Sequence, residues 1–96
     1  MSRSTIPATA TVAAASDVLA TAFDDDLVLL NLRDGVYYGL EGVGTRVWSL
    51  IQQPRPLAEI RDALTEEFDV DPGRCERDLR ALLGDLVKRG LAVVQP

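Results

Sequence analysis

The fold is decided by residues 27–40, LVLLNLRDGVYYGL, where two apolar segments meet at one Asp-Gly pair. Asp34 and Gly35 favour a two-residue type I′ turn, because both central positions of that turn need positive φ and this dipeptide tolerates it. The flanking segments are rich in branched and aromatic residues, which are typical of β-strands. The register that this turn predicts pairs Leu32 with Tyr37 and Asn31 with Tyr38.

A third strand precedes this hairpin. Residues 18–23 (VLATAF) have strand character, and Asp24, Asp25 and Asp26 behind them suit a tight, solvated turn. The sequence therefore predicts an antiparallel meander with strands near residues 18–23, 27–33 and 36–40.

Three later stretches repeat apolar side chains at intervals near 3.6 residues, which is typical of helices. The second is expected to begin at Pro56, and the third at Pro72 with Asp71 as its N-cap and Gly90 as its end. The tail, LAVVQP, is expected to add a short strand. We therefore predict an α+β fold of winged helix-turn-helix-like shape, a three-stranded antiparallel meander followed by three helices. The apolar positions are Val43, Val47, Leu50 and Ile51, then Leu57, Ile60, Leu64 and Phe68, then Cys75, Leu79, Leu82, Leu83, Leu86 and Val87.

The chain divides into two regions by composition. Residues 1–16 are rich in Ala, Thr and Ser without a sustained period, and we expect a flexible N-terminal arm. With 96 residues and 47% apolar content in all, residues 17–96 are expected to form one domain with one modest core.

Composition also limits the chemistry. The chain has no His and a single Cys, which disfavours a metal site, a cofactor and nucleophilic catalysis, so we expect no enzyme activity. The net charge of -5 opposes binding to nucleic acid or to an anionic membrane surface. We expect a cytoplasmic protein, since the sequence has no membrane-spanning run and only a weak export-like segment. Residues 24–26 lack the spacing of a calcium loop.

Residues 57–90 contain two helices and a short connection, which resemble a helix-turn-helix. A DNA-binding regulator is therefore an alternative function. Acidic residues on the second of these helices nearly balance its basic ones, and a helix that enters a DNA groove would be repelled by phosphate. The residues concerned are Arg74, Arg77 and Arg80 against Asp71, Glu76, Asp78 and Asp85.

The last strand of the meander, residues 36–40, has an outer side with no partner inside the hairpin. Its free N–H and C=O groups could pair with another chain. Alternation places Tyr37 and Tyr38 on opposite faces, but it leaves open which face meets the helices. Both faces of the predicted sheet are apolar, which suggests that something outside the domain covers one of them.

Residues 27–51 and 57–94, LVLLNLRDGVYYGLEGVGTRVWSLI and LAEIRDALTEEFDVDPGRCERDLRALLGDLVKRGLAVV, resemble the PqqD-like domains. These domains recognise the leader segments of ribosomally synthesised, post-translationally modified peptides. The resemblance covers roughly residues 17–95 and is strongest to the stand-alone members of lasso-peptide clusters. Glu41 is a departure, because the family usually has Asn or Asp there as a helix cap.

The resemblance implies that a precursor's leader adds as an antiparallel strand to the last strand of the meander, beside a wall formed by the third helix. It implies two partner enzymes, a leader protease and an ATP-dependent cyclase, to which the domain, a monomer when free, delivers the precursor. A pyrroloquinoline quinone pathway role with a radical SAM enzyme is the alternative within the family. The implied leader-binding residues are Val36, Tyr37, Tyr38, Gly39, Leu40, Cys75, Asp78, Leu79, Leu82 and Leu86.

Overall fold

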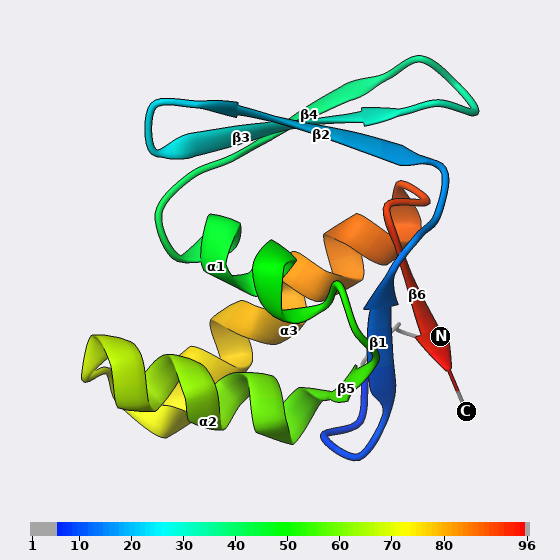
Figure 1. Ribbon diagram of the computed structural model, residues 1–96. Coiled ribbons are helices and arrows are strands. Elements are labelled where there is room, and N and C mark those ends of the chain that lie inside the picture. Colours follow the sequence, from blue (N-terminus) through cyan, green and yellow to red (C-terminus); the bar gives the residue numbers. More distant parts are fainter. Residues whose placement is uncertain (1–5, 96) are drawn as a thin grey trace.

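The computed structural model describes residues 6–95, which form two antiparallel sheets and three helices (Figure 1). One sheet has the strand order β2-β3-β4 and the other β5-β1-β6. The elements in chain order are β1 (Thr11–Ala14), β2 (Val18–Phe23), β3 (Asp26–Asn31), β4 (Tyr37–Leu40), α1 (Val43–Leu50), β5 (Arg55–Pro56), α2 (Leu57–Phe68), α3 (Pro72–Lys88) and β6 (Ala92–Gln95).

The predicted meander and the three helices after it are confirmed. The β2-β3-β4 sheet lies across one end of the molecule, and the helices and the smaller sheet lie together on one side of it (Figure 1). Its helix-facing side buries Leu29, Asn31 and Leu40. Leu19 and Tyr37 lie on its other side and remain exposed.

The register predicted for the hairpin is wrong by two residues. Leu30 pairs with Tyr37 and Leu29 with Tyr38. Asp34 is not among the residues with positive φ, so the predicted type I′ turn is also wrong; Gly35 alone in this loop has φ of 73°.

The cause of the longer loop is the Asn31 side chain. Its Oδ1 accepts a hydrogen bond from the Arg33 N–H at 2.9 Å, and its Nδ2 donates to the Arg89 carbonyl oxygen at 2.9 Å. The buried amide is thereby satisfied, and it closes the loop two residues earlier than the Asp-Gly pair would. A slip of two residues keeps every side chain on its predicted face, since side chains alternate with a period of two.

The third helix, α3, supplies much of the core. Leu79, Leu83 and Leu86 are buried on one side of it, where α3 packs against α2 and the sheets. Its predicted start is confirmed, because Asp71 is the N-cap and accepts a hydrogen bond from the Arg74 N–H at 2.9 Å. The other predicted helices are found as well, although α2 begins one residue after Pro56.

The predicted flexible arm over residues 1–16 is wrong for residues 6–16; residues 1–5 lie outside the described part. β1 is the central strand of the smaller sheet, between β5 and β6. Val12 is fully buried, and Ile6 is 6% exposed. The expected strand in the C-terminal tail is confirmed as β6, and its partner is this N-terminal segment.

The N-terminal segment also completes the start of α2. That helix has no side-chain cap, and the N–H groups of Leu57 and Ala58 donate to the carbonyl oxygens of Ala10 and Ala8, both at 3.0 Å. These bonds satisfy donors that every helix leaves free at its N-terminus. On the other side, Arg80 of α3 donates to the Ile6 carbonyl oxygen at 2.7 Å. The order of this segment therefore comes from distant partners.

We predict that Val12→Ala lowers the free energy of unfolding by roughly 2 kcal/mol, because it removes buried methyl groups and leaves a cavity. Urea unfolding would measure the change. The matched control is Val93→Ala on β6, opposite Ala13, where the side chain is 44% exposed. Equal, small losses from both substitutions would contradict the packing of β1 described above.

Candidate functional site

β4 presents a free sheet edge. Within residues 6–95 it pairs only with β3, so its other side bonds to no strand. The Asn31 N–H donates to the Val36 carbonyl oxygen at 3.0 Å, and bonding alternates along an antiparallel pair. Tyr38 and Leu40 therefore direct their backbone groups to β3, whereas Tyr37 and Gly39 direct theirs outward.

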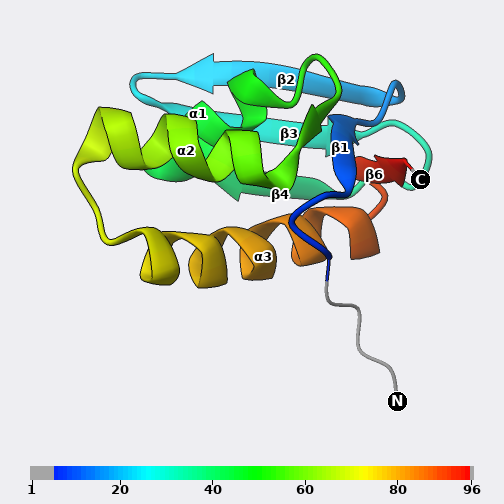
Figure 2. The same cartoon turned by 90° about the horizontal axis from the view of Figure 1, so that it is seen from below.

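Tyr38 connects this edge to α3. Its hydroxyl donates to Asp85 Oδ2 at 2.7 Å, and the Arg89 guanidinium lies 5.0 Å from the centre of its ring. Arg89 Nε also donates to Asp85 Oδ1 at 3.2 Å. These contacts link β4 to α3, which run close together at this side of the sheet (Figure 2).

The same contacts shift two ionisation equilibria. Burial and the hydrogen bond to Asp85 raise the pKa of Tyr38 above its ordinary value of 10.0. The hydrogen bond from Tyr38 holds the pKa of Asp85 below its ordinary value of 3.8. At neutral pH the pair is therefore a neutral phenol and a carboxylate, which is the state that this hydrogen bond requires.

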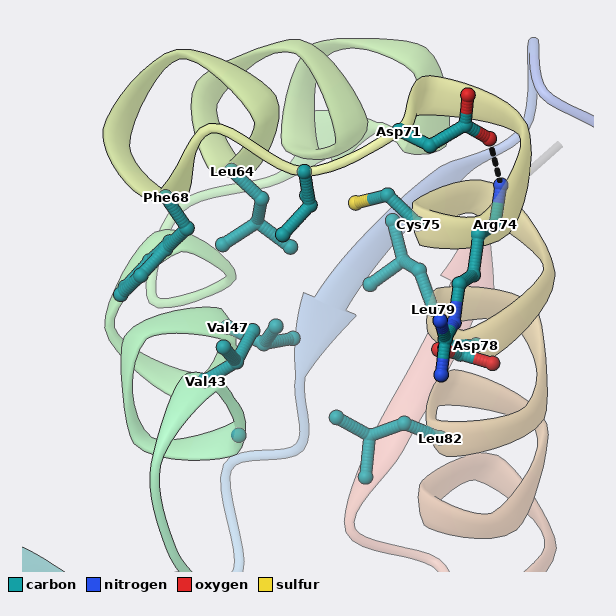
Figure 3. A pocket seen from close by; sticks show the side chains of 12 residues that line it. Val43, Val47, Leu64, Phe68, Asp71, Arg74, Cys75, Asp78, Leu79 and Leu82 are labelled. Atoms are coloured by element: carbon teal, nitrogen blue, oxygen red, sulfur yellow. Dashed lines mark hydrogen bonds and ion pairs between the residues drawn. The ribbon is translucent and has the colours of Figure 1, made fainter.

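A hollow of about 540 Å³ opens where β4 ends, between α1, the end of α2 and the start of α3 (Figure 3). Gly44 lines it and lies against the Leu40 side chain, so the hollow adjoins the end of the free edge. Its apolar lining is Val43, Val47, Leu64, Phe68, Val70, Leu79 and Leu82, and its polar lining is Asp71, Arg74 and Asp78, with Cys75 beside them.

A smaller hollow of about 180 Å³ lies at the other end of β4. Val36, Tyr38 and Arg89 contribute to its lining. The Tyr38 hydroxyl bonds to Asp85, whereas the larger hollow adjoins Leu40. The free edge thus has a hollow near each end, and the contact of Tyr38 with α3 borders the smaller one.

The structure brings together most of the residues that the sequence assigns to the site. Tyr37 is 67% exposed on the outer face of the sheet, whereas Tyr38 points toward α3. Val36 precedes β4 and is 50% exposed. The remaining members that reach a surface are Gly39 on the edge and Cys75, Asp78 and Leu82 in the larger hollow, whereas Leu79, 3% exposed, lines that hollow from the core.

Two assigned residues lie in the core instead. Leu86 is fully buried and lines neither hollow, so its predicted place in the helix wall is wrong. The physical reason is that Leu86 continues the buried side of α3 with Leu79 and Leu83. Leu40 is 4% exposed and belongs to the core as well.

Sequence reasoning missed Asp85 and Arg89. The signal was available, since Asp78, Leu82, Asp85 and Arg89 follow a helical spacing of four, three and four residues and so share one side of α3. The apolar pattern drew attention to the neighbouring side. The lining from α1 was also missed, because nothing local relates that helix to α3.

The described residues offer little reactive chemistry. Residues 6–95 contain no cluster of three or more side chains that could hold a metal ion. Burial raises the pKa of the Cys75 thiol above its ordinary value of 9.0, so the thiolate is scarce at neutral pH. None of the helices in this part of the chain is long and apolar enough to cross a membrane.

Comparison with known proteins identifies the family to which this fold belongs. The family model described as coenzyme PQQ synthesis protein D (PqqD) matches residues 26–92. The chain belongs to the PqqD family. A search of curated proteins found no match.

Two similar solved structures are complexes with a leader peptide. TbiB1 in complex with the TbiA(beta) leader peptide is 40% identical, with a TM-score of 0.77 over 83% of this chain and 93% of that one. A lasso peptide synthetase B1 complexed with the leader peptide is 26% identical, with a TM-score of 0.75 over 85% of this chain and 96% of that one. The resemblance found in the sequence is thereby confirmed.

We predict that Tyr38 titrates above pH 10.0. The phenolate absorbance of a Tyr37→Phe variant, in which Tyr38 is the remaining tyrosine, would measure this pKa. Asp85→Asn should lower this pKa yet leave it above 10.0, because burial is the larger cause. Arg89→Gln should raise it, since the guanidinium favours the phenolate. Because the folded state holds this proton more tightly than the unfolded state, stability should fall as pH rises above 10.0. A Tyr38 titration midpoint that neither variant changes would contradict the contacts of Tyr38 with Asp85 and Arg89.

Proposed function

We propose that this protein binds the leader segment of a ribosomally synthesised precursor peptide, which adds as a strand to the free edge of β4. The observation that carries the proposal is that edge, with the outward backbone groups of Tyr37 and Gly39 and a hollow near each end. Strand addition uses backbone hydrogen bonds for affinity and side-chain pockets for selectivity. The leader complexes of the two similar structures support it.

The direction of the leader follows from antiparallel pairing. Its N-terminal part would lie at the Leu40 end of β4 and reach the larger hollow, and its C-terminal part would pass Val36. A large apolar side chain suits that hollow, because Val47, Leu79 and Leu82 contribute to an apolar lining. Asp78 at its rim is 72% exposed and available to a polar or basic group of the leader.

The role is positional and involves no catalysis by this chain. Holding the leader keeps the attached core peptide at a high local concentration beside the processing enzymes. In the lasso-peptide branch these enzymes are a leader protease and an ATP-dependent cyclase. We propose that this chain serves them in the cytoplasm as a monomer. The alternative is a PqqD-type role with a radical SAM enzyme, and the match to the PqqD family model is the observation that supports it.

The backbone part of the proposal is tested at Gly39, whose N–H points outward. Gly39→Pro removes that donor without touching the bonds to β3, and proline is tolerated on edge strands. We expect leader affinity, measured by fluorescence anisotropy with the cognate leader, to fall at least roughly tenfold. Gly39→Ala is the matched control, because a Cβ there meets nothing within 4 Å and the N–H remains. Unimpaired binding by the proline variant would rule out addition to this edge.

The hollow is tested at Asp78. We expect Asp78→Ala to weaken leader binding roughly two- to fivefold at low salt, as for an exposed ion pair, with the melting temperature unchanged. The loss should shrink as salt rises, since salt screens exposed charges. Asp62→Ala on α2, where the side chain is 67% exposed, is the control and should bind normally. Equal losses from both variants would mean a general charge effect.

A further inference from the structure

The larger hollow is bordered by two helix ends that the core does not hold. α1 is anchored through its second half, where Val47 and Leu50 are buried, whereas Val43 at its start is 43% exposed. α2 is anchored through residues up to Leu64, whereas Phe68 at its end is 42% exposed. Val43 and Phe68 lie on one side of the hollow and face α3 across it (Figure 3). Segments with few buried contacts open more easily than a core, so this wall can move unless another contact holds it.

Arg46 and Glu67 join these two helix ends. Arg46 lies in the first turn of α1 and Glu67 in the last turn of α2. The Arg46 Nε donates to Glu67 Oε1 and its Nη2 donates to Oε2, both at 2.8 Å. Paired bonds of this kind fix the orientation of the partners as well as their distance. Within residues 6–95 no other ion pair involves α1, so this pair, the Arg46–Glu67 clamp, ties the start of α1 to the end of α2.

The clamp contributes geometry more than stability. Its side chains are 40% and 36% exposed, so water screens their attraction and the pair adds little to the stability of the domain. The hydrogen bonds from Arg46 lower the pKa of Glu67 below its ordinary value of 4.5, so both partners are charged at neutral pH. Loss of the clamp should therefore release the two helix ends while the core stays folded. A wall that is already in place lowers the entropic cost of binding a flexible peptide.

We propose that Arg46 and Glu67 are positioning residues, which hold the larger hollow at the width that an apolar side chain of the leader requires. This inference rests on the proposed function. Neither residue lines the hollow, so the pair acts through Val43 and Phe68, which do. The clamp then contributes to leader affinity only through the N-terminal part of the leader, which reaches the hollow.

The reactivity of Cys75 measures access to the hollow without any ligand, because this single Cys of the chain is part of its lining. Arg46→Glu sets two carboxylates against each other, and we expect Cys75 to react with N-ethylmaleimide roughly threefold faster than in the parent as the hollow opens. The added negative charge alone would raise the thiol pKa and slow the reaction, so the direction of the change separates the two causes. Arg77→Glu is the control, since it makes the same charge change at an exposed position of α3 outside the lining, and it should give no acceleration.

Leader binding is measured by fluorescence anisotropy with two probes, the cognate leader and a version truncated from its N-terminus to the segment that pairs with β4. We expect Arg46→Glu to weaken binding of the full leader roughly fivefold and to leave the truncated leader unaffected, because the clamp acts on the hollow alone. A general loss of stability would weaken both leaders equally. Arg46→Glu combined with Glu67→Arg restores opposite charges at the net charge of the parent. This double variant should return both the Cys75 rate and the affinity to within roughly twofold of the parent.

A milder variant guards against a folding defect in the first. Glu67→Gln keeps the size of the side chain and weakens the pair, so it should change the Cys75 rate and the leader affinity in the same directions by smaller amounts. Glu59→Gln is its control on the same helix, where the side chain is 63% exposed, and it should behave as the parent.

An unchanged Cys75 rate and leader affinity in Arg46→Glu would overturn the inference. So would equal losses for the two leaders, or a double variant that stays as impaired as Arg46→Glu. A parent chain that binds no leader would overturn the proposed function instead, and the Cys75 rate would still test the clamp, which separates the two failures.

Discussion

The burial of one side of α3 is the constraint on which the rest of the structure depends. Leu79, Leu83 and Leu86 hold this helix against α2 and the sheets. The core thereby fixes the adjoining side of α3 beside β4, where Asp85 meets Tyr38. The distance between helix and sheet edge is thus a property of the core. Ligand contacts need not organise it, which lowers the entropic cost of binding a flexible peptide.

The parts of the fold that could be predicted from the sequence are those with local signals. Helical spacing and the Asp71 cap located α3, and strand composition located the meander. β1 escaped notice because its order comes from pairing with β6, where Val94 lies 82 residues after its partner Val12, and from capping α2. The predicted hairpin register was wrong for the same reason, since the Asn31 side chain donates to the Arg89 carbonyl oxygen, 58 residues away. The long-range, buried hydrogen bond of Asn31 outweighs the local preference of Asp34 and Gly35 for a two-residue turn.

The candidate site was predictable in part. Alternation placed the two tyrosines on opposite faces, but apolar residues on both faces of the sheet concealed which one met the helices. The structure shows Tyr38 there, held by Asp85 and Arg89. On α3, a shift of one residue along the helix turns a side chain by about 100°. That rotation separates Leu86, in the core, from Asp85, which faces β4. Apolar periodicity selects the buried side first and overlooks the polar side next to it.

The pairing of β1 with β6 has a consequence for how the domain can be used. Thr11 pairs with Gln95, so the first and last strands of the described chain lie side by side in the smaller sheet (Figure 1). The β2-β3-β4 sheet is separate from them. A domain whose first and last described strands pair with each other, away from the free edge of β4, can be spliced onto, or inserted within, a larger polypeptide as a self-contained unit. The free edge of β4 would stay accessible in either arrangement.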